Sequence, residues 1–390
     1  MIVVISNRNL KLAKPITSPE VHPISVLGSD MSNQGNSYGV LLKRQAGKGE
    51  QIKLFPQGKE NDMFDDLVKK IDAAGPNHEL KRPWVMFVHG FNQTIEKNIA
   101  KARNIEKSFS EGGRQVNVIV FSWPSQPVPG KTDEVMKAIK KKIVKKVVHS
   151  SLTATMLGVI TDYIEDYWRT YTLARMNAES SADDMSTAYR VVQNQLLKKV
   201  RRKLTISLIV HSLGNYLTQN TVKAHGAIAA RFEHVILHQA DAASAEQNQW
   251  VPVLARSAQH TYITINKFDS VLAVSFVYNQ KERLGQSQQG FIQNKNISYC
   301  DFTGIPGVIW DDGTGSCLNE NDHDLFVLPL DKCADDMYLL LSRLLRSEKT
   351  GLPTVFAKSG PNNFMKTRRK INYYQPKLII DDFGDVVSPI

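Results

Sequence analysis

The sequence predicts an α/β fold with a mostly parallel central sheet, and three observations lead to that class. Short runs rich in Val and Ile recur along the chain, helical periodicity separates them, and the chain can bury a large core. Of its 390 residues, 42% are hydrophobic and 22% are charged. This composition excludes a disordered chain, a collagen-like repeat and a small domain held together by disulfides.

Five apolar runs are short enough for strands that are buried on both faces. They are Val85–Val88, Val116–Phe121, Leu204–Val210, His234–Leu237 and Thr261–Ile265. Continuous apolar runs, without polar alternation, indicate inner strands of a parallel sheet. Helices are expected at Ile95–Phe109, Asn215–Ala224 and Asp335–Leu345, which gives the alternating order of an α/β protein. Earlier β segments, near Ile2–Ile5, Tyr38–Lys43 and Ile52–Leu54, predict an antiparallel start to the sheet.

One connection is too long for a simple crossover. About 80 residues separate Phe121 from Leu204, where a dozen or two suffice in most α/β units. Three helices fit there: one starts at Thr132, one runs through Met156–Tyr171, and one follows Ser181. We interpret the first two as a lid insertion and the third as the crossover helix. The predicted parts are therefore core residues 1–130, a helical lid at 131–180, core residues 181–347 and a C-terminal extension at 348–390.

The charge of the chain favours anionic partners. Its 49 Lys and Arg exceed its 38 Asp and Glu, for a formal net charge of +11. The first lid helix carries six lysines around an apolar face, and such a helix can lie on an anionic membrane or pack its apolar side on the core. These are Lys137, Lys140, Lys141, Lys142, Lys145 and Lys146. No nucleic-acid-binding motif accompanies the basic runs at 198–203 and 366–370, so no specific nucleic acid partner is expected.

We expect a cytoplasmic protein, with peripheral membrane contact through the lid as a further expectation. The three cysteines lack the CxxC pairs of zinc sites, the N-terminus lacks a signal-peptide pattern, and no apolar run approaches ~20 residues.

No cofactor or metal is assigned. The cluster at 319–324 lacks the Gly and Glu spacing of a calcium loop, and in the P-loop-like segment at 125–132 Pro127 and Pro129 remove amides that would hold phosphate.

The strand Leu204–Val210 runs directly into His211, Ser212, Leu213 and Gly214, and then into a predicted helix. A serine at a sharp turn from strand to helix projects its hydroxyl above the sheet edge, and the helix N-terminus stabilises negative charge there. Val210 stands at the first Gly position of the GxSxG pattern, which weakens the bare motif. Ser212 is nevertheless the candidate nucleophile, because the surrounding motifs support the assignment.

A second motif supports an oxyanion hole. The segment WVMFVHGFN, at residues 84–92, is a buried strand followed by His-Gly-Phe. In serine hydrolases of this architecture, this loop and the residue after the nucleophile each supply one backbone N–H. The candidate donors are therefore Phe91 and Leu213. His89 and His211 are interpreted as structural hydrogen-bonding residues at the starts of their loops.

A nucleophilic serine needs a histidine base and a carboxylate that orients it, in the chain order Ser, Asp or Glu, His. The two strands after Ser212 are followed by Asp241 and Asp269, and we favour Asp269 because the acid usually follows the second of these strands. Asp241 stays the alternative acid. His323 lies downstream of both and is the candidate base, whereas His260 opens a strand and would lie at the opposite end of the sheet.

Taken together, the motifs FVHGFN, VIVFSWPS, IVHSLGNYL and NKFDSVLAVS resemble those of a bacterial α/β-hydrolase family of unknown function, in which FVHGFN, FSWPS and AHSMGN are hallmarks. The elbow of that family also lacks the first Gly and has Ala where this chain has Val210. The resemblance covers roughly residues 1–345. It implies an α/β-hydrolase fold with helices on both faces of the sheet, and it aligns Ser212, Asp269 and His323 with the nucleophile, acid and base.

These inferences predict a serine hydrolase that cleaves a carboxylic ester through an acyl-enzyme, with lipid or phospholipid substrates ahead of small soluble esters. Two alternatives remain: an acyltransferase that uses the same acyl-enzyme, and a protein-binding scaffold that retains the elbow without catalysis.

Overall fold

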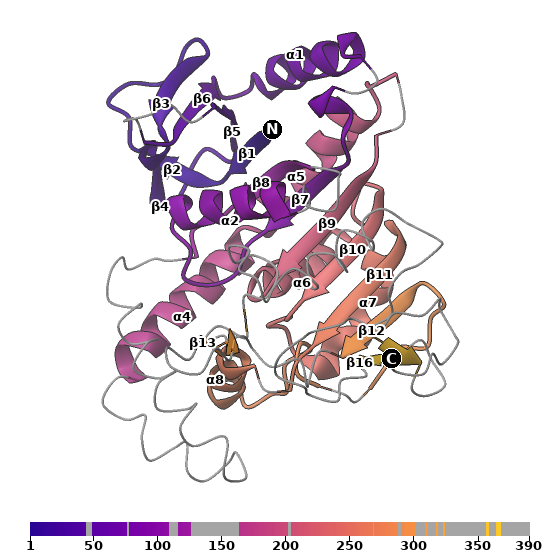
Figure 1. The fold of residues 1–390 in the computed structure, drawn as a ribbon. Coiled ribbons are helices and arrows are strands. Elements are labelled where there is room, and N and C mark those ends of the chain that lie inside the picture. Colours follow the sequence, from indigo (N-terminus) through magenta and orange to yellow (C-terminus); the bar gives the residue numbers. More distant parts are fainter. Residues whose placement is uncertain are drawn as a thin grey trace.

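The computed structural model describes residues 1–43, 49–75, 78–108, 116–125, 164–201, 204–267, 269–287 and 290–301, and short pieces at 309–310, 317–318, 323, 356–358 and 364–367. Within these residues one large sheet dominates, and the predicted α/β class is confirmed (Figure 1). Its strand order is β15-β16-β12-β11-β10-β9-β7-β8-β1-β5-β6-β3.

The strands are β1 (Ile2–Ser6), β2 (Arg8–Leu10), β3 (Glu20–Pro23), β4 (Leu27–Met31), β5 (Ser37–Leu41), β6 (Gln51–Phe55), β7 (Trp84–Val88), β8 (Asn117–Ser122), β9 (Ile206–His211), β10 (Phe232–His238), β11 (Ala258–Ile265), β12 (Ile297–Asp301), β13 (Ile309–Trp310), β14 (Cys317–Leu318), β15 (Phe356–Lys358) and β16 (Phe364–Thr367). The strands from β16 to β1 in the order of the sheet run parallel, and antiparallel strands flank them on both sides. Two further pairs, β2 with β4 and β13 with β14, lie outside this sheet.

The longer helices are α1 (Glu60–Ala73), α2 (Ile95–Ser108), α4 (Ile164–Ser180), α5 (Ala182–Val191), α6 (Gly214–His225), α7 (Gln247–Ala255) and α8 (Ser270–Asn279). A π-helical segment, η3 (Val192–Leu197), continues α5, and short 3-10 turns lie at η1 (Ile24–Val26), η2 (Glu79–Lys81) and η4 (Ser244–Glu246).

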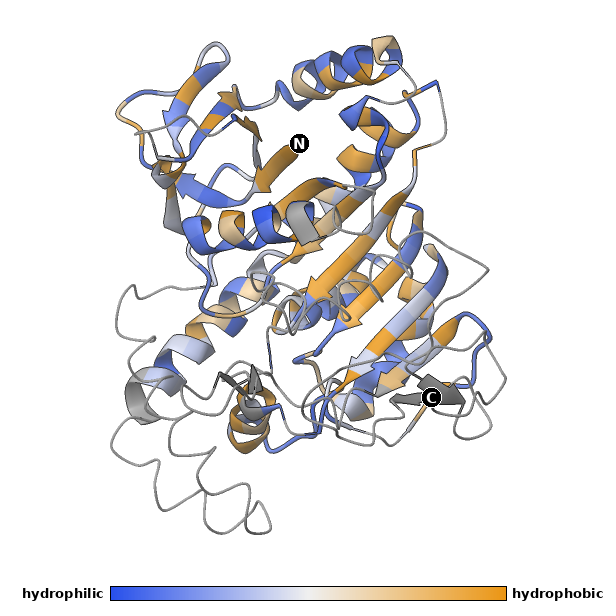
Figure 2. Ribbon diagram, in the orientation of Figure 1, coloured by the Kyte–Doolittle hydropathy of each residue, from blue (hydrophilic) through white to orange (hydrophobic). Residues whose placement is uncertain are grey.

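The sheet separates two apolar cores, so helices cover both of its faces. Met86 and Leu208 point to the face that packs against α1, α4, α5, α6 and α7, and their neighbours Phe87 and Ile209 point to the face covered by α2. Successive side chains of a strand alternate between faces, so a strand buried on both sides must be apolar throughout. Figure 2 shows this pattern, because the middle strands are mostly orange while α1 and α2 alternate between orange and blue.

The five predicted inner strands are present as β7, β8, β9, β10 and β11, with boundaries shifted by a few residues. β1 differs from the prediction, because it runs parallel to β8 and only its other neighbour, β5, is antiparallel. Every residue of β1 is buried, as an inner strand requires. The antiparallel start of the sheet therefore begins at β5.

Several predictions fall outside the described residues. They include the first lid helix with its six lysines, the P-loop-like residues 126–132, the helix at Asp335–Leu345 and most of the extension at 348–390. Of the second lid helix, the structure describes α4. No helix among the described residues is long and apolar enough to cross a membrane.

Candidate active site

Ser212 lies at the sharp turn between β9 and α6, as the sequence predicts. Its backbone φ is +53°, a left-handed conformation that costs a non-glycine residue energy and survives only where its surroundings hold it. The Ser212 N–H donates to the carbonyl of His238 at 3.0 Å, and the Ser212 carbonyl accepts from the side-chain amide of Asn215 at 3.0 Å. These bonds anchor the turn to the neighbouring strand and to the first turn of α6.

Two glycines let the backbone come close to Ser212. A Cβ added to Gly90 would lie 2.5 Å from the Ser212 Cβ, and one added to Gly214 would lie 2.6 Å from the His89 carbonyl oxygen. Real Cβ atoms essentially never make contacts below 3.0 Å. The His-Gly-Phe loop therefore rests directly on the elbow, and any side chain at residue 90 would push them apart.

The structure brings Ser212, His323 and Asp269 together from three separate parts of the chain. The Ser212 Oγ lies 2.6 Å from His323 Nε2, and His323 Nδ1 lies 2.6 Å from Asp269 Oδ2. With Nδ1 protonated, His323 donates to Asp269 and accepts the Ser212 hydroxyl proton at Nε2. All three residues are buried, with Ser212 2% exposed, His323 5% and Asp269 0%.

Asp269 has two functions in this arrangement, one for each carboxylate oxygen. Its Oδ1 accepts from the N–H groups of Val271 at 3.0 Å and Leu272 at 2.9 Å, so it caps the N-terminus of α8. Its Oδ2 bonds to His323. The cap fixes the carboxylate on a helix, and the second oxygen is then held in place for the imidazole.

Asp241, the alternative acid, makes a different set of contacts. Its carboxylate accepts hydrogen bonds from the hydroxyls of Tyr171, at 2.7 Å, and Ser275, and it pairs with Arg283, whose Nε is 3.3 Å from Oδ1. Asp241 and Arg283 are both buried. Its backbone N–H also donates to the Ser212 carbonyl at 3.1 Å. The structure thus places Asp241 beside the elbow but directs its carboxylate away from His323.

The two predicted oxyanion donors flank Ser212. Leu213 directly precedes the first turn of α6, and Phe91 follows Gly90 in the loop that rests on the elbow. Neither backbone N–H donates a hydrogen bond to another described residue. Both N–H groups lie near the N-terminus of α6, where the electrostatic field of the helix favours negative charge.

His89 and His211, interpreted from the sequence as structural residues, both form hydrogen bonds to backbone groups. The His89 ring stacks on Trp123 at 5.4 Å, accepts from the Trp123 N–H at 3.1 Å and donates from Nδ1 to the Gly90 carbonyl at 2.9 Å. Burial, with a smaller contribution from Arg8, lowers the pKa of His89 well below its ordinary value. His89 therefore stays neutral and ties the His-Gly-Phe loop to the segment after β8.

The contact of His211 was not predicted. Its Nε2 donates to the backbone carbonyl of His323 at 2.8 Å, so the residue before Ser212 holds the backbone of the candidate base. The only sequence signal for this contact is its position next to Ser212. The Tyr171 and Ser275 contacts of Asp241 had no signal, because they join segments that are far apart in the chain.

Helix α4 lies against this site. Tyr167 and Tyr171 are buried on its inner side, and both rings meet the Phe91 ring edge to face, with centroids 5.7 and 5.4 Å apart. The helix also packs on α6, which begins next to Ser212. In the part of the chain that the structure describes, no three His, Cys, Asp or Glu side chains cluster closely enough to hold a metal ion.

One comparison with known proteins finds a matching family. A family model described as "Alpha/beta hydrolase of unknown function (DUF900)" matches residues 76–306. The matched region runs from just before β7 to just after β12, so it includes Ser212 and Asp269 and ends before His323. No curated protein and no solved structure matches the chain.

Proposed function

The chain belongs to the DUF900 family of α/β hydrolases, and from this premise we propose that it is a serine hydrolase that cleaves a carboxylic ester. The observation that carries the proposal is the continuous hydrogen-bonded chain from Ser212 through His323 to Asp269, with both links at 2.6 Å. A nucleophile, a base and an orienting acid in this order are the components of acyl transfer through a covalent intermediate.

In the proposed reaction, Ser212 Oγ attacks the ester carbonyl carbon while its proton moves to His323 Nε2. Asp269 holds the ring in the reactive tautomer and stabilises the imidazolium that forms. The carbonyl oxygen becomes an oxyanion, which accepts hydrogen bonds from the Phe91 and Leu213 amides. Collapse of the tetrahedral intermediate releases the alcohol, which takes its proton from His323 and leaves an acyl group on Ser212.

Water completes the cycle. His323 Nε2 takes a proton from the water as it attacks the acyl carbon. As the second tetrahedral intermediate collapses and the carboxylic acid leaves, His323 returns that proton to Ser212 Oγ. We propose lipid esters ahead of small soluble ones, because of the six lysines and apolar face predicted for residues 132–147.

A fluorophosphonate probe tests the proposal directly, since it reacts only with an activated serine. The native chain should label, Ser212→Ala should not, and His323→Ala and Asp269→Asn should label at least about 100-fold more slowly. Asp241→Asn changes the alternative acid and is the matched control. It should label faster than Asp269→Asn. Circular dichroism checks that each variant is folded.

Labelling that persists in Ser212→Ala would refute the assignment of the nucleophile. A larger loss in Asp241→Asn than in Asp269→Asn would reverse the assignment of the acid. Retained ester hydrolysis by folded Ser212→Ala would refute the serine mechanism itself.

A further inference from the structure

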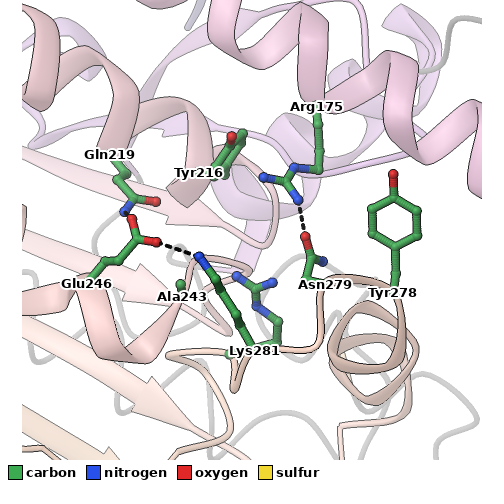
Figure 3. Close-up of a pocket in the computed structure, with 9 residues that line it drawn as sticks. Arg175, Tyr216, Gln219, Ala243, Glu246, Tyr278, Asn279 and Lys281 are labelled. Carbon is green, nitrogen blue, oxygen red and sulfur yellow. Dashed lines mark hydrogen bonds and ion pairs between the residues drawn. The ribbon is translucent and has the colours of Figure 1, made fainter.

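A pocket of about 500 Å³ lies apart from the candidate triad, and one of its lining residues, Arg283, is the ion-pair partner of Asp241. Figure 3 shows residues that line this pocket. Its lining comes from α4, α6, η4 and the segment at the end of α8. The nine lining residues are Arg175, Tyr216, Gln219, Ala243, Glu246, Tyr278, Asn279, Lys281 and Arg283. All but Ala243 carry a polar or charged group, and three are cations. Such a lining suits a polar, negatively charged ligand better than an acyl chain.

Arg283 is the most informative of these residues. Its side chain is only 4% exposed, yet it lines the pocket. Its Nε lies 3.3 Å from Asp241, but its two Nη atoms donate to no other described residue. A buried guanidinium loses the hydration of its N–H groups, so these donors need an acceptor. The ion pair with Asp241 occupies only the Nε side of the Arg283 guanidinium, so the Nη donors are available to a ligand in the pocket.

The position of Arg283 is fixed by its backbone. The Leu284 N–H donates to the Ala242 carbonyl at 2.8 Å, and the Gly285 N–H donates to the Ala240 carbonyl at 2.9 Å. A Cβ on Gly285 would come within 2.5 Å of the Ala240 N, so the two loops are in close contact. These contacts fix the Arg283 backbone, and the ion pair with Asp241 positions its guanidinium before any ligand arrives, which reduces the cost of ordering it.

Arg175 supplies a second guanidinium from the opposite side. It descends from α4, donates to the side-chain oxygen of Asn279 and lies over the Tyr216 ring, 4.3 Å from the centroid (Figure 3). No ion pair joins it to a carboxylate of the described residues. Arginine forks of this kind match the oxygens of phosphate or carboxylate.

Glu246 is the one acidic residue in the lining, and its charge is already offset. Its carboxylate accepts from Gln219 at 2.9 Å, from Lys223 at 2.6 Å and from Lys281 at 3.2 Å. The hydrogen bond from Lys223 lowers the pKa of Glu246, so it is ionised at neutral pH. Among the lining residues, the three cations Arg175, Lys281 and Arg283 exceed the one carboxylate, Glu246, for a charge of about +2 at the pocket wall.

We propose that this pocket binds a phosphate group. Arg175 reaches it from α4, and Lys281 and Arg283 reach it from the segment after α8. A tetrahedral phosphate accepts from several directions at once, whereas a carboxylate offers two oxygens in one plane. A phosphate dianion also matches the local charge. The pocket is linked to the candidate active site, because Asp241 contacts Arg283 through its carboxylate and the Ser212 carbonyl through its N–H.

Calorimetric titration of the full-length chain with inorganic phosphate tests the site without relying on hydrolysis, so its failure is separate from failure of the proposed function. Phosphate should bind, acetate should bind at least tenfold more weakly, and Arg175→Gln should weaken phosphate binding at least tenfold. Arg201→Gln is the matched control, because the Arg201 side chain is 89% exposed and outside the pocket. Absent phosphate binding, or equal affinity in native protein and Arg175→Gln, would overturn the proposal.

Two esters distinguish the source of the phosphate. Dibutyrylglycerol 3-phosphate and dibutyrylglycerol share the same ester bonds and differ only in the phosphate. If the substrate carries the phosphate, the KM of the phosphorylated ester should be at least tenfold lower, and Arg175→Gln should remove the difference. If a free phosphate compound regulates the enzyme, both esters should have similar KM values and added phosphate should change the rate on the neutral one.

Discussion

Replacing Gly90 with alanine tests whether the His-Gly-Phe loop and the elbow are held in contact for catalysis. The new Cβ would lie 2.5 Å from the Ser212 Cβ and 3.0 Å from its Oγ, where ordinary contact begins at 3.4 Å. The loop or the serine must therefore move by about 0.9 Å, and a displacement near 1 Å at reacting atoms costs about 100-fold in rate. Overpacking of this kind also costs about 1–3 kcal/mol of stability.

The assay compares fluorophosphonate labelling rates and urea unfolding for the native chain, Gly90→Ala and Gly75→Ala. Gly75 is the matched control, because a Cβ there would meet nothing within 4 Å. Gly90→Ala should label about 100-fold more slowly and unfold at lower urea concentration, while Gly75→Ala should resemble the native chain. A Gly90→Ala variant that labels within threefold of the native rate and has native stability would refute the reasoning.

Two further predictions concern buried basic groups that support the site. Arg8 is 1% exposed and donates to Ser122 Oγ, the Gly28 carbonyl and the Gln93 carbonyl, and burial lowers its pKa to about 9, so it is charged at neutral pH. Arg8→Met should lower the unfolding free energy by about 2–4 kcal/mol in urea denaturation, since three buried acceptors lose their donor; a loss under 0.5 kcal/mol would contradict this. Burial keeps His89 neutral in the folded chain, so below pH ~6.5 the unfolded chain binds one more proton than the folded chain. Titration of His89 therefore leaves the unfolding free energy unchanged above that pH and decreases it as the pH falls further. Between pH 6 and pH 5, the unfolding free energy of His89→Gln should fall by up to about 1.4 kcal/mol less than that of the native chain. An equal fall in both proteins would show that His89 is protonated in the folded protein.

The inner strands could be predicted because burial on both faces leaves a plain mark in the sequence. β7 and β9 lie in the middle of the sheet, so both faces must be apolar and the Val and Ile runs are unbroken. β12 was missed because its sequence, ISYCD, mixes polar and apolar residues. β1 and β8 were both predicted as strands, but their parallel pairing was not, because a short apolar run carries no information about the direction of its neighbour.

The positions of Ser212 and Asp269 followed from topology, whereas His323 was chosen from its place in the chain order and from the family resemblance. The carboxyl ends of parallel strands meet at one edge, so residues just after β9 and β11 must lie near each other. The contacts of His211 and Arg283 could not be predicted, because each depends on a side chain meeting a segment that is remote in sequence. Such contacts are set by packing, which single-sequence patterns do not record.

The choice between the two acids shows what the structure adds. Asp241 and Asp269 both follow inner strands, so strand ends alone leave the assignment open. Hydrogen-bond capacity separates them. Asp241 shares its two oxygens among Tyr171, Ser275 and Arg283, whereas Asp269 uses one oxygen to cap α8 and directs the other to His323.

The two carboxylates therefore have different surroundings, although they sit at neighbouring strand ends. Asp269 has no cation of the described residues within ion-pair distance apart from His323, so its charge is available to the imidazolium that the proposed reaction creates. Asp241 is already paired with Arg283 and would stabilise that imidazolium less. The same pairing holds Arg283 at the edge of the pocket that it lines. The carboxylate of Asp241, after β10, is thus directed to Arg283, and the carboxylate of Asp269, after β11, is directed to the candidate base.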